Sequence, residues 1–285
     1  MSFISRRNFI KSSAFLIAAA QAKAAQPASA GGFKAGVAVR DITPHPGIPM
    51  WGYTDRGGPS EGTLDPLHAR AIVFEVEEQR IALVSMDTGR VPVPDRLNRI
   101  RERVKAAGVD QVVFVATHTH GAPVMEIDSL PHLPAMETAF GELIEEAAGR
   151  IAPVQIGVGK AVFDISHNRR KITEDGKCVM VWRNEERIPL GPVDHEAVII
   201  KIESEDGKPL AALVHNACHP VVLAGDNLRY TADWPGEMAR IVKEAWGGEC
   251  IFIQGGCGNI NPYLDKTPIA ESGVEAMRGV GQTCA

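Results

Sequence analysis

The sequence lacks several features that mark particular classes of protein. Aromatic residues make up 6% of the chain, which does not favour a surface on which sugar rings stack. The net charge of -5, with no long basic run in residues 31–285, gives no electrostatic reason to expect a nucleic-acid partner. The five cysteines contain no Cys-x-x-Cys pair, so a thiolate zinc finger is not expected. One disulfide and none at all are both compatible with them.

The composition itself is that of an ordinary globular protein with many turns. Hydrophobic residues make up 45% and charged residues 23% of the 285 positions, enough for one large domain or two small ones. The 28 glycines and 19 prolines predict many loops rather than a helical bundle. After the first thirty residues, no segment is long and apolar enough to be transmembrane.

The first thirty residues contain the three parts of a cleavable export signal. Residues 5–11 read Ser-Arg-Arg-Asn-Phe-Ile-Lys, an apolar stretch covers 14–20, and Ala-x-Ala sites follow at 22–24 and 28–30. The arginine pair predicts a twin-arginine signal over residues 1–30 and a periplasmic or secreted mature domain, residues 31–285. That route carries folded proteins, so a metal could be loaded before export. The alternative is an amphipathic helix that stays attached to the membrane.

Short strand-like runs alternate with longer stretches of helical spacing, which predicts an α/β fold. Neighbouring short strands indicate layered, mixed β-sheets flanked by helices. Helices are expected at 95–107, 136–150 and 234–246, with another beginning near 271. Strands are expected at 35–40, 69–76, 80–85, 111–116, 154–163, 179–182, 197–203, 211–214 and 250–253. The continuous apolar run at 111–116 is typical of a buried central strand.

The strongest local signal follows this run, in the segment Thr117-His-Thr-His-Gly-Ala-Pro123. If strand geometry persists, residues two apart point the same way, so His118 and His120 would reach one site. Sheets in α/β proteins place ligands at strand ends, and imidazole suits zinc, which takes three protein ligands and a water in catalytic sites. Alternatively, both histidines only cap the turn by hydrogen bonding.

A second histidine pair, His215 and His219, follows the expected strand 211–214. Pro220 holds His219 in an extended conformation, and the preceding strand argues against the helix on which a four-residue spacing would share a metal. We therefore expect only His219 to be a ligand, and His215 to be buried and satisfied by the backbone.

Four further features stand at the ends of expected elements. Asp233 opens a helix and is explained by capping, while Asp87 is a carboxylate after the strand 80–85. The glycine-rich turn 255–258 either brings N–H groups to an oxyanion or is a simple tight loop. Arg169, within Asn168-Arg169-Arg170, could hold a substrate carbonyl or carboxylate, although a lone arginine is more often a solvated surface residue.

Taken together, these motifs resemble the N-terminal catalytic region of the neutral/alkaline non-lysosomal ceramidase family, over nearly all of residues 31–285. The resemblance implies a ceramidase-like N-terminal domain that hydrolyses the amide of ceramide with one zinc. The matching blocks are residues 36–44, 50–53, 64–71, 85–89, 117–123, 168–169, 219–220, 232–236 and 258–262.

The resemblance also implies roles for individual residues. His118 and His219 would be zinc ligands, His120 would lie beside the metal, and Arg169 would lie in the substrate pocket. The family takes a glutamate and a tyrosine ligand from later sequence that is absent here, so we expect the chain to be incomplete at its C-terminus or the site to be completed differently. Asn261 replaces the serine of the family's Gly-Asp-Val-Ser-Pro turn. It cannot form an acyl-enzyme but could donate a hydrogen bond to an oxyanion.

The sequence therefore predicts an exported, zinc-dependent hydrolase of an amide bond. Zn²⁺ would be held by His118 and His219, with His120, Arg169 and Asn261 as catalytic residues. A small-molecule or lipid substrate and peripheral membrane contact are expected, without nucleic acid. Two alternatives are a zinc hydrolase of another ester or amide, and a non-catalytic exported binding protein on the same fold.

Overall fold

The computed structural model describes residues 32–285, so the predicted signal peptide at 1–30 lies outside the described residues. Eight strands form one hydrogen-bonded sheet in the order β13-β11-β10-β6-β1-β3-β4-β5. These strands are β1 (Lys34–Asp41), β3 (His68–Val76), β4 (Gln79–Met86), β5 (Gln111–Ala116), β6 (Ala152–Val162), β10 (Glu196–Ser204), β11 (Pro209–Asn216) and β13 (Glu249–Gln254). The sheet is mixed, because β4–β5 and β11–β13 pair in parallel and the other neighbours are antiparallel.

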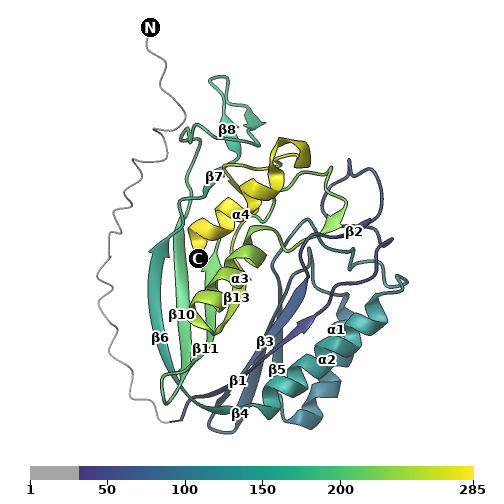
Figure 1. Cartoon of the computed structure of the whole chain (residues 1–285), viewed down its shortest axis with the longest axis vertical. Coiled ribbons are helices and arrows are strands. Elements are labelled where there is room, and N and C mark those ends of the chain that lie inside the picture. The colour runs from purple at the N-terminus through teal and green to yellow at the C-terminus, as the bar shows by residue number, and fades with distance from the viewer. Residues whose placement is uncertain (1–31) are drawn as a thin grey trace.

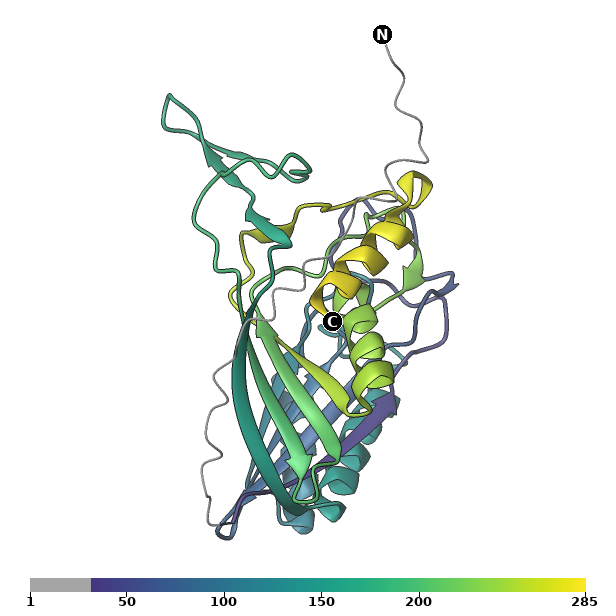
Figure 2. The same cartoon turned by 60° about the vertical axis from the view of Figure 1, so that its left-hand side comes forward.

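The sheet bends into two halves that pack face to face. Only two residue pairs, Lys34 with Pro153 and Ala35 with Ala152, join β1 to β6. The inner faces of both halves supply one apolar cluster, which includes Ile72, Ile202 and Ile251. Figure 2 shows the green strands of one half in front of the blue and purple strands of the other.

Helices cover the outer faces, which gives four layers in the order helix, sheet, sheet, helix (Figures 1 and 2). Helices α1 (Pro94–Val104) and α2 (Leu133–Gly149) pack on β1, β3 and β4, while α3 (Asp233–Trp246) and α4 (Gly273–Cys284) pack on β11 and β13. In β3, Ala69, Ala71 and Val73 face the helices and Ile72 faces the inner cluster. Both faces of such a strand are buried, and its sequence is therefore almost continuously apolar.

The short elements gather at one end of the layers, where Figure 1 labels β2, β7 and β8. Each short strand pairs with only one other: β2 with β12, β7 with β14, and β8 with β9. Their bounds are β2 (Gly62–Thr63), β7 (Ser166–Asn168), β8 (Arg170–Ile172), β9 (Cys178–Met180), β12 (Arg229–Tyr230) and β14 (Ile260–Pro262), and two 3₁₀ turns complete the chain at η1 (Lys105–Ala107) and η2 (Ile269–Glu271).

The predicted α/β fold with mixed sheets and flanking helices is confirmed, and every expected strand and helix is present, most of them with shifted ends. The prediction that residues 111–116 form a central strand was wrong. Strand β5 lies at the edge of the sheet, pairs only with β4, and leaves the Val113 side chain 49% exposed. Apolar content alone did not distinguish an edge strand from a central one. Five of the six short strands were missed, because elements of two or three residues have no readable periodicity.

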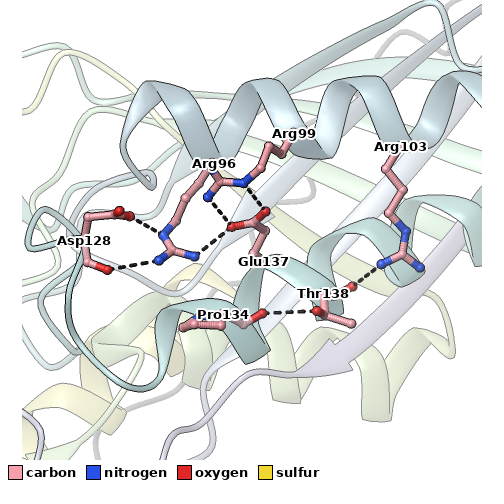
Figure 3. Close-up of polar contacts among 7 residues, drawn as sticks. All are labelled: Arg96, Arg99, Arg103, Asp128, Pro134, Glu137 and Thr138. Carbon is pink, nitrogen blue, oxygen red and sulfur yellow. Dashed lines mark hydrogen bonds and ion pairs between the residues drawn. The ribbon is translucent and has the colours of Figure 1, made fainter.

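Helices α1 and α2 are joined by ion pairs around the buried Arg96 (Figure 3). The Arg96 guanidinium donates to Glu137 at 2.7 Å and also contacts Asp128 in the loop before α2. Arg99 donates two hydrogen bonds to the same Glu137 carboxylate, each at 2.7 Å. Because Arg96 is buried, this carboxylate compensates a charge that water does not reach.

The five cysteines are all free thiols in the structure, and four of them, Cys218, Cys250, Cys257 and Cys284, are buried. Of the two states that the sequence allowed, the described chain therefore has the one without a disulfide. Within residues 32–285, no helix combines the length and the apolar character needed to cross a bilayer.

Candidate metal centre

His118 and His120 enter the site from a turn rather than from an extended strand. Strand β5 ends at Ala116, and His118 has a φ of 70°, in the left-handed region. Its N–H donates to the Thr88 carbonyl at 3.0 Å, which ties the turn to the residues after β4. The argument that strand geometry persists through both histidines was therefore wrong, but the turn still brings their ring centroids to 5.6 Å.

His219 reaches the same place from the other half of the sheet. It follows β11, and its N–H donates to the Ile260 carbonyl at 2.9 Å. Its ring centroid lies 4.9 Å from that of His118 and 5.7 Å from that of His120. One nitrogen from each of the three rings lies within 4.8 Å of the others. The carboxyl ends of two parallel strand pairs, β4–β5 and β11–β13, thus meet at one cluster of three imidazoles.

Backbone carbonyls fix the orientation of two of these rings. The Nδ1 atom of His118 lies 2.8 Å from the Gly89 carbonyl, and that of His219 lies 2.6 Å from the Cys257 carbonyl. A carbonyl can only accept, so each Nδ1 carries the proton and each Nε2 keeps a free lone pair. Metal-binding histidines are usually held in this way.

His120 differs from the other two, because both of its ring nitrogens are buried without a hydrogen-bond partner. The rings of Trp51 and Tyr53 pack against it, each with its centroid 4.8 Å away. Gly52 lies so close that an added Cβ would stand 2.4 Å from the His120 ring. The site therefore encloses an imidazole whose polar atoms nothing in the described chain satisfies.

Burial keeps the three imidazoles neutral at pH 7. Burial, reinforced by His219 and His118, lowers the pKa of His120 to about 2. Burial and His118 lower the pKa of His219 to about 4, and burial also lowers the pKa of His118, against the hydrogen bond to Gly89. Neutral imidazoles with free nitrogens are the form that binds transition-metal ions, so the residues present fit a divalent ion such as zinc.

The two other predicted catalytic residues lie beside this cluster rather than within it. Arg169 follows β7 and donates through Nη2 to the Gly258 carbonyl at 2.9 Å, and its charge contributes to the lowered pKa of His219. Asn261 lies in β14, is buried, and donates through Nδ2 to Asp265 at 2.7 Å, while its Oδ1 has no partner.

One prediction on a nearby residue was wrong, and another was incomplete. His215, near the C-terminal end of β11, is exposed rather than buried. Asp233 does more than cap α3: its buried carboxylate accepts N–H groups from Val222 and Leu223, both at 3.2 Å, and from Trp234 at 2.8 Å. It therefore holds the loop after His219 against the helix.

Asp87 forms a buried structural ion pair that connects two strands. Its carboxylate accepts the His68 N–H and the Arg70 guanidinium, each at 2.9 Å, and both side chains of the ion pair are buried. The pair fixes the start of β3 beside the end of β4, directly before the Thr88 carbonyl that holds His118.

Sequence reasoning gave no role to Trp51, Tyr53 and Arg56, which come from the loop after β1. The Arg56 guanidinium donates to the His120 carbonyl at 2.6 Å, and the Tyr53 hydroxyl donates to the Leu223 carbonyl at 2.7 Å. The only available signal was the Met50-Trp-Gly-Tyr53 block, which formed part of the resemblance without an assigned function.

The fold and the site can now be compared with known proteins. No protein-family model matches the chain. A crystal structure of neutral ceramidase from Pseudomonas aeruginosa matches with a TM-score of 0.73 and 21% identity, over 88% of this chain and 43% of that chain. A ceramidase complexed with C2 matches with a TM-score of 0.72 and 20% identity, over 88% of this chain and 42% of that one.

The chain has a neutral ceramidase-like fold. The predicted resemblance is confirmed at the level of structure. The chain spans less than half the length of either matched structure. At sequence identities near 20%, the comparison shows a similarity of fold only.

Proposed function

We propose that this protein is a metal-dependent hydrolase that acts on an acyl amide at the three-histidine cluster. The observation that supports this most is the convergence of His118, His120 and His219, all neutral, from two distant segments of the sequence. The ceramidase-like fold agrees with a hydrolase. Zinc, when bound at such a site, polarises a carbonyl and lowers the pKa of a bound water to ~7.

The hydrogen bonds of the three rings divide their roles. His118 and His219 have Nδ1 engaged by a carbonyl and Nε2 free, which favours both as zinc ligands. His120 has no such orienting partner and keeps both nitrogens free, which favours a role in proton transfer. Burial keeps the ring neutral at pH 7, so His120 would act by accepting a hydrogen bond from the attacking water and orienting it.

Arg169 would orient the substrate. Its guanidinium stands beside His219 and is held by the Gly258 carbonyl, with Nε buried and unpartnered. A donor in that position can bind a carbonyl or carboxylate oxygen of the substrate. Asn261, with one amide N–H committed to Asp265, retains a second N–H for the same purpose.

Zinc analysis of purified protein tests the ligands directly. His118→Ala and His219→Ala should each lose most of the bound zinc, because each removes a lone pair that a carbonyl-held ring directs into the cluster. His120→Asn should retain zinc but lose hydrolysis. His45→Ala, which changes an exposed histidine, is the matched control. Full zinc content in both ligand variants would rule out this centre.

The substrate class needs a separate assay. We expect turnover of a fluorescent ceramide or of simpler N-acyl compounds, and comparison with simple esters separates amide from ester hydrolysis. Activity on esters alone would refute the amide proposal and leave the metal centre standing.

Export through the twin-arginine route is part of the same proposal, together with a mature domain at residues 31–285. Replacement of Arg6 and Arg7 by lysines should retain the protein in the cytoplasm, whereas the native sequence should direct it to the periplasm. Equal periplasmic amounts of both forms in cell fractions would contradict this.

A further inference from the structure

Two cations beside the histidine cluster share one indole ring and have no carboxylate partner. The Arg169 guanidinium carbon lies 4.8 Å from the Trp182 ring centroid, and the Lys266 ammonium nitrogen lies 3.3 Å from it. In residues 32–285, no carboxylate oxygen comes within 4.0 Å of either cation. The neighbouring Arg183 and Arg187, in contrast, each form an ion pair with an acidic side chain.

Hydrogen bonds to backbone carbonyls place both cations on the His219 side of the site. Arg169 donates to Gly258, the residue after Cys257, whose carbonyl holds the His219 ring. The Lys266 N–H donates to the Val221 carbonyl at 2.9 Å, two residues after His219. Consistent with this position, Arg169 contributes to the lowered pKa of His219, and Lys266 acts in the same direction on His120.

The surroundings leave this positive charge largely uncompensated. Asp265 is the acidic side chain that acts most strongly on Lys266, followed by Asp55, but the Asp265 carboxylate already accepts a hydrogen bond from Asn261. Burial raises the pKa of Asp265 to about 7, so part of its charge is absent at neutral pH. Trp182 is 39% exposed, which opens this side to solvent.

We propose that Arg169 and Lys266 bind an anionic group of the substrate, so that the site selects acyl amides whose amine half carries a carboxylate or sulfonate. This rests on amide hydrolysis at the histidine cluster. The buried, unpartnered Nε of Arg169 requires an acceptor, and a guanidinium and an ammonium together recognise an oxyanion strongly. Trp182 holds both side chains against its ring and so reduces the entropy that they lose on binding.

Three amides with the same acyl chain test this selectivity on the zinc-loaded full chain. N-lauroylglycine and N-lauroyltaurine carry an anion, and N-lauroylethanolamine is neutral. Lys266→Met should lower kcat/KM for both anionic amides by about tenfold relative to the neutral one, because it removes one charged contact. Lys266→Arg should restore the preference. Lys171→Met removes the same charge from exposed β8 and should leave the preference unchanged.

The outcomes separate this inference from the proposed function. An unchanged preference in Lys266→Met, with hydrolysis intact, would overturn the anion site and leave the hydrolase standing.

If no amide is turned over, calorimetric binding of the same compounds tests the inference instead. The native chain should bind N-lauroylglycine about tenfold more tightly than N-lauroylethanolamine, and Lys266→Met should abolish this difference in affinity. Equal binding would overturn the inference. Lys266-dependent binding of laurate alone would also overturn it, because the cations would then hold the acyl product. Circular dichroism and zinc content verify that each variant is folded.

Discussion

Replacing His120 with glutamine should change how the stability of the metal-free protein depends on pH. In the unfolded chain a histidine takes up its proton near pH 6.5, whereas folded His120 has a pKa of about 2. Between these values only the unfolded state gains the proton, so the ring contributes a loss of stability as the pH falls below 6.5. Each pH unit is worth about 1.4 kcal/mol, and the loss from pH 6.5 to 4.5 is therefore about 3 kcal/mol.

The pH dependence of the native protein alone would not isolate His120, because other buried groups change the stability in the opposite direction as the pH falls. The His120→Gln variant keeps those groups and therefore serves as the reference. Burial raises the pKa of Asp65 and Asp265 to about 7 and that of Asp233 to about 6. These carboxyls take up protons in the folded state before they do so in the unfolded state, and they stabilise the fold as the pH falls. Their contribution cancels in the difference between native protein and His120→Gln.

Urea denaturation in the presence of a chelator, at pH 7 and pH 4.5, measures that difference. We expect the free energy of unfolding of His120→Gln to rise by about 3 kcal/mol relative to the native protein between the two pH values. His45→Gln, which makes the same substitution at an exposed histidine, is the control variant. A constant difference for His120→Gln would refute the reasoning, because folded His120 would then accept a proton as readily as the unfolded chain.

Three further predictions concern the frame around the site. Asp87→Asn should destabilise the protein by about 3 kcal/mol in urea denaturation, because it leaves the buried Arg70 without its counter-charge. Glu137→Gln should lower the free energy of unfolding by about 2 kcal/mol, since Arg96 is buried in the same way but keeps a second acidic contact. Gly121→Ala should lower the melting temperature and the zinc content together, because its new Cβ would meet the Thr231 side chain at 2.4 Å and displace the turn that carries the proposed ligand His118.

The fold was largely predictable from the sequence, because each long element carries its own periodicity. Strand β3 and helix α3, for example, appear within two residues of their expected positions. The arrangement of these elements was less accessible. Strand β5 is as apolar as a central strand, yet it lies at the edge, because its position depends on pairing with distant residues rather than on its own composition.

The candidate site was predictable in part, for the same reason. His118, His120 and His219 were identifiable because histidines directly follow apolar runs. Arg56 and Lys266 carry no such mark, and they reach the site only through loops whose paths depend on tertiary hydrogen bonds. Loops are also where binding residues concentrate, so sequence reasoning is weakest where specificity is decided.

The position of the histidine cluster connects the fold to the proposed chemistry. His118 belongs to one half of the sheet and His219 to the other, and the two halves share only two residue pairs of strand hydrogen bonding, at β1 and β6. A zinc ion bound by both rings would therefore join the halves at the strand ends. Because the rings converge only in the folded chain, binding would stabilise the native state alone, by about 3 kcal/mol when free zinc exceeds its Kd a hundredfold. A chain assembled and loaded in this way before export would fit the twin-arginine route, which carries folded proteins.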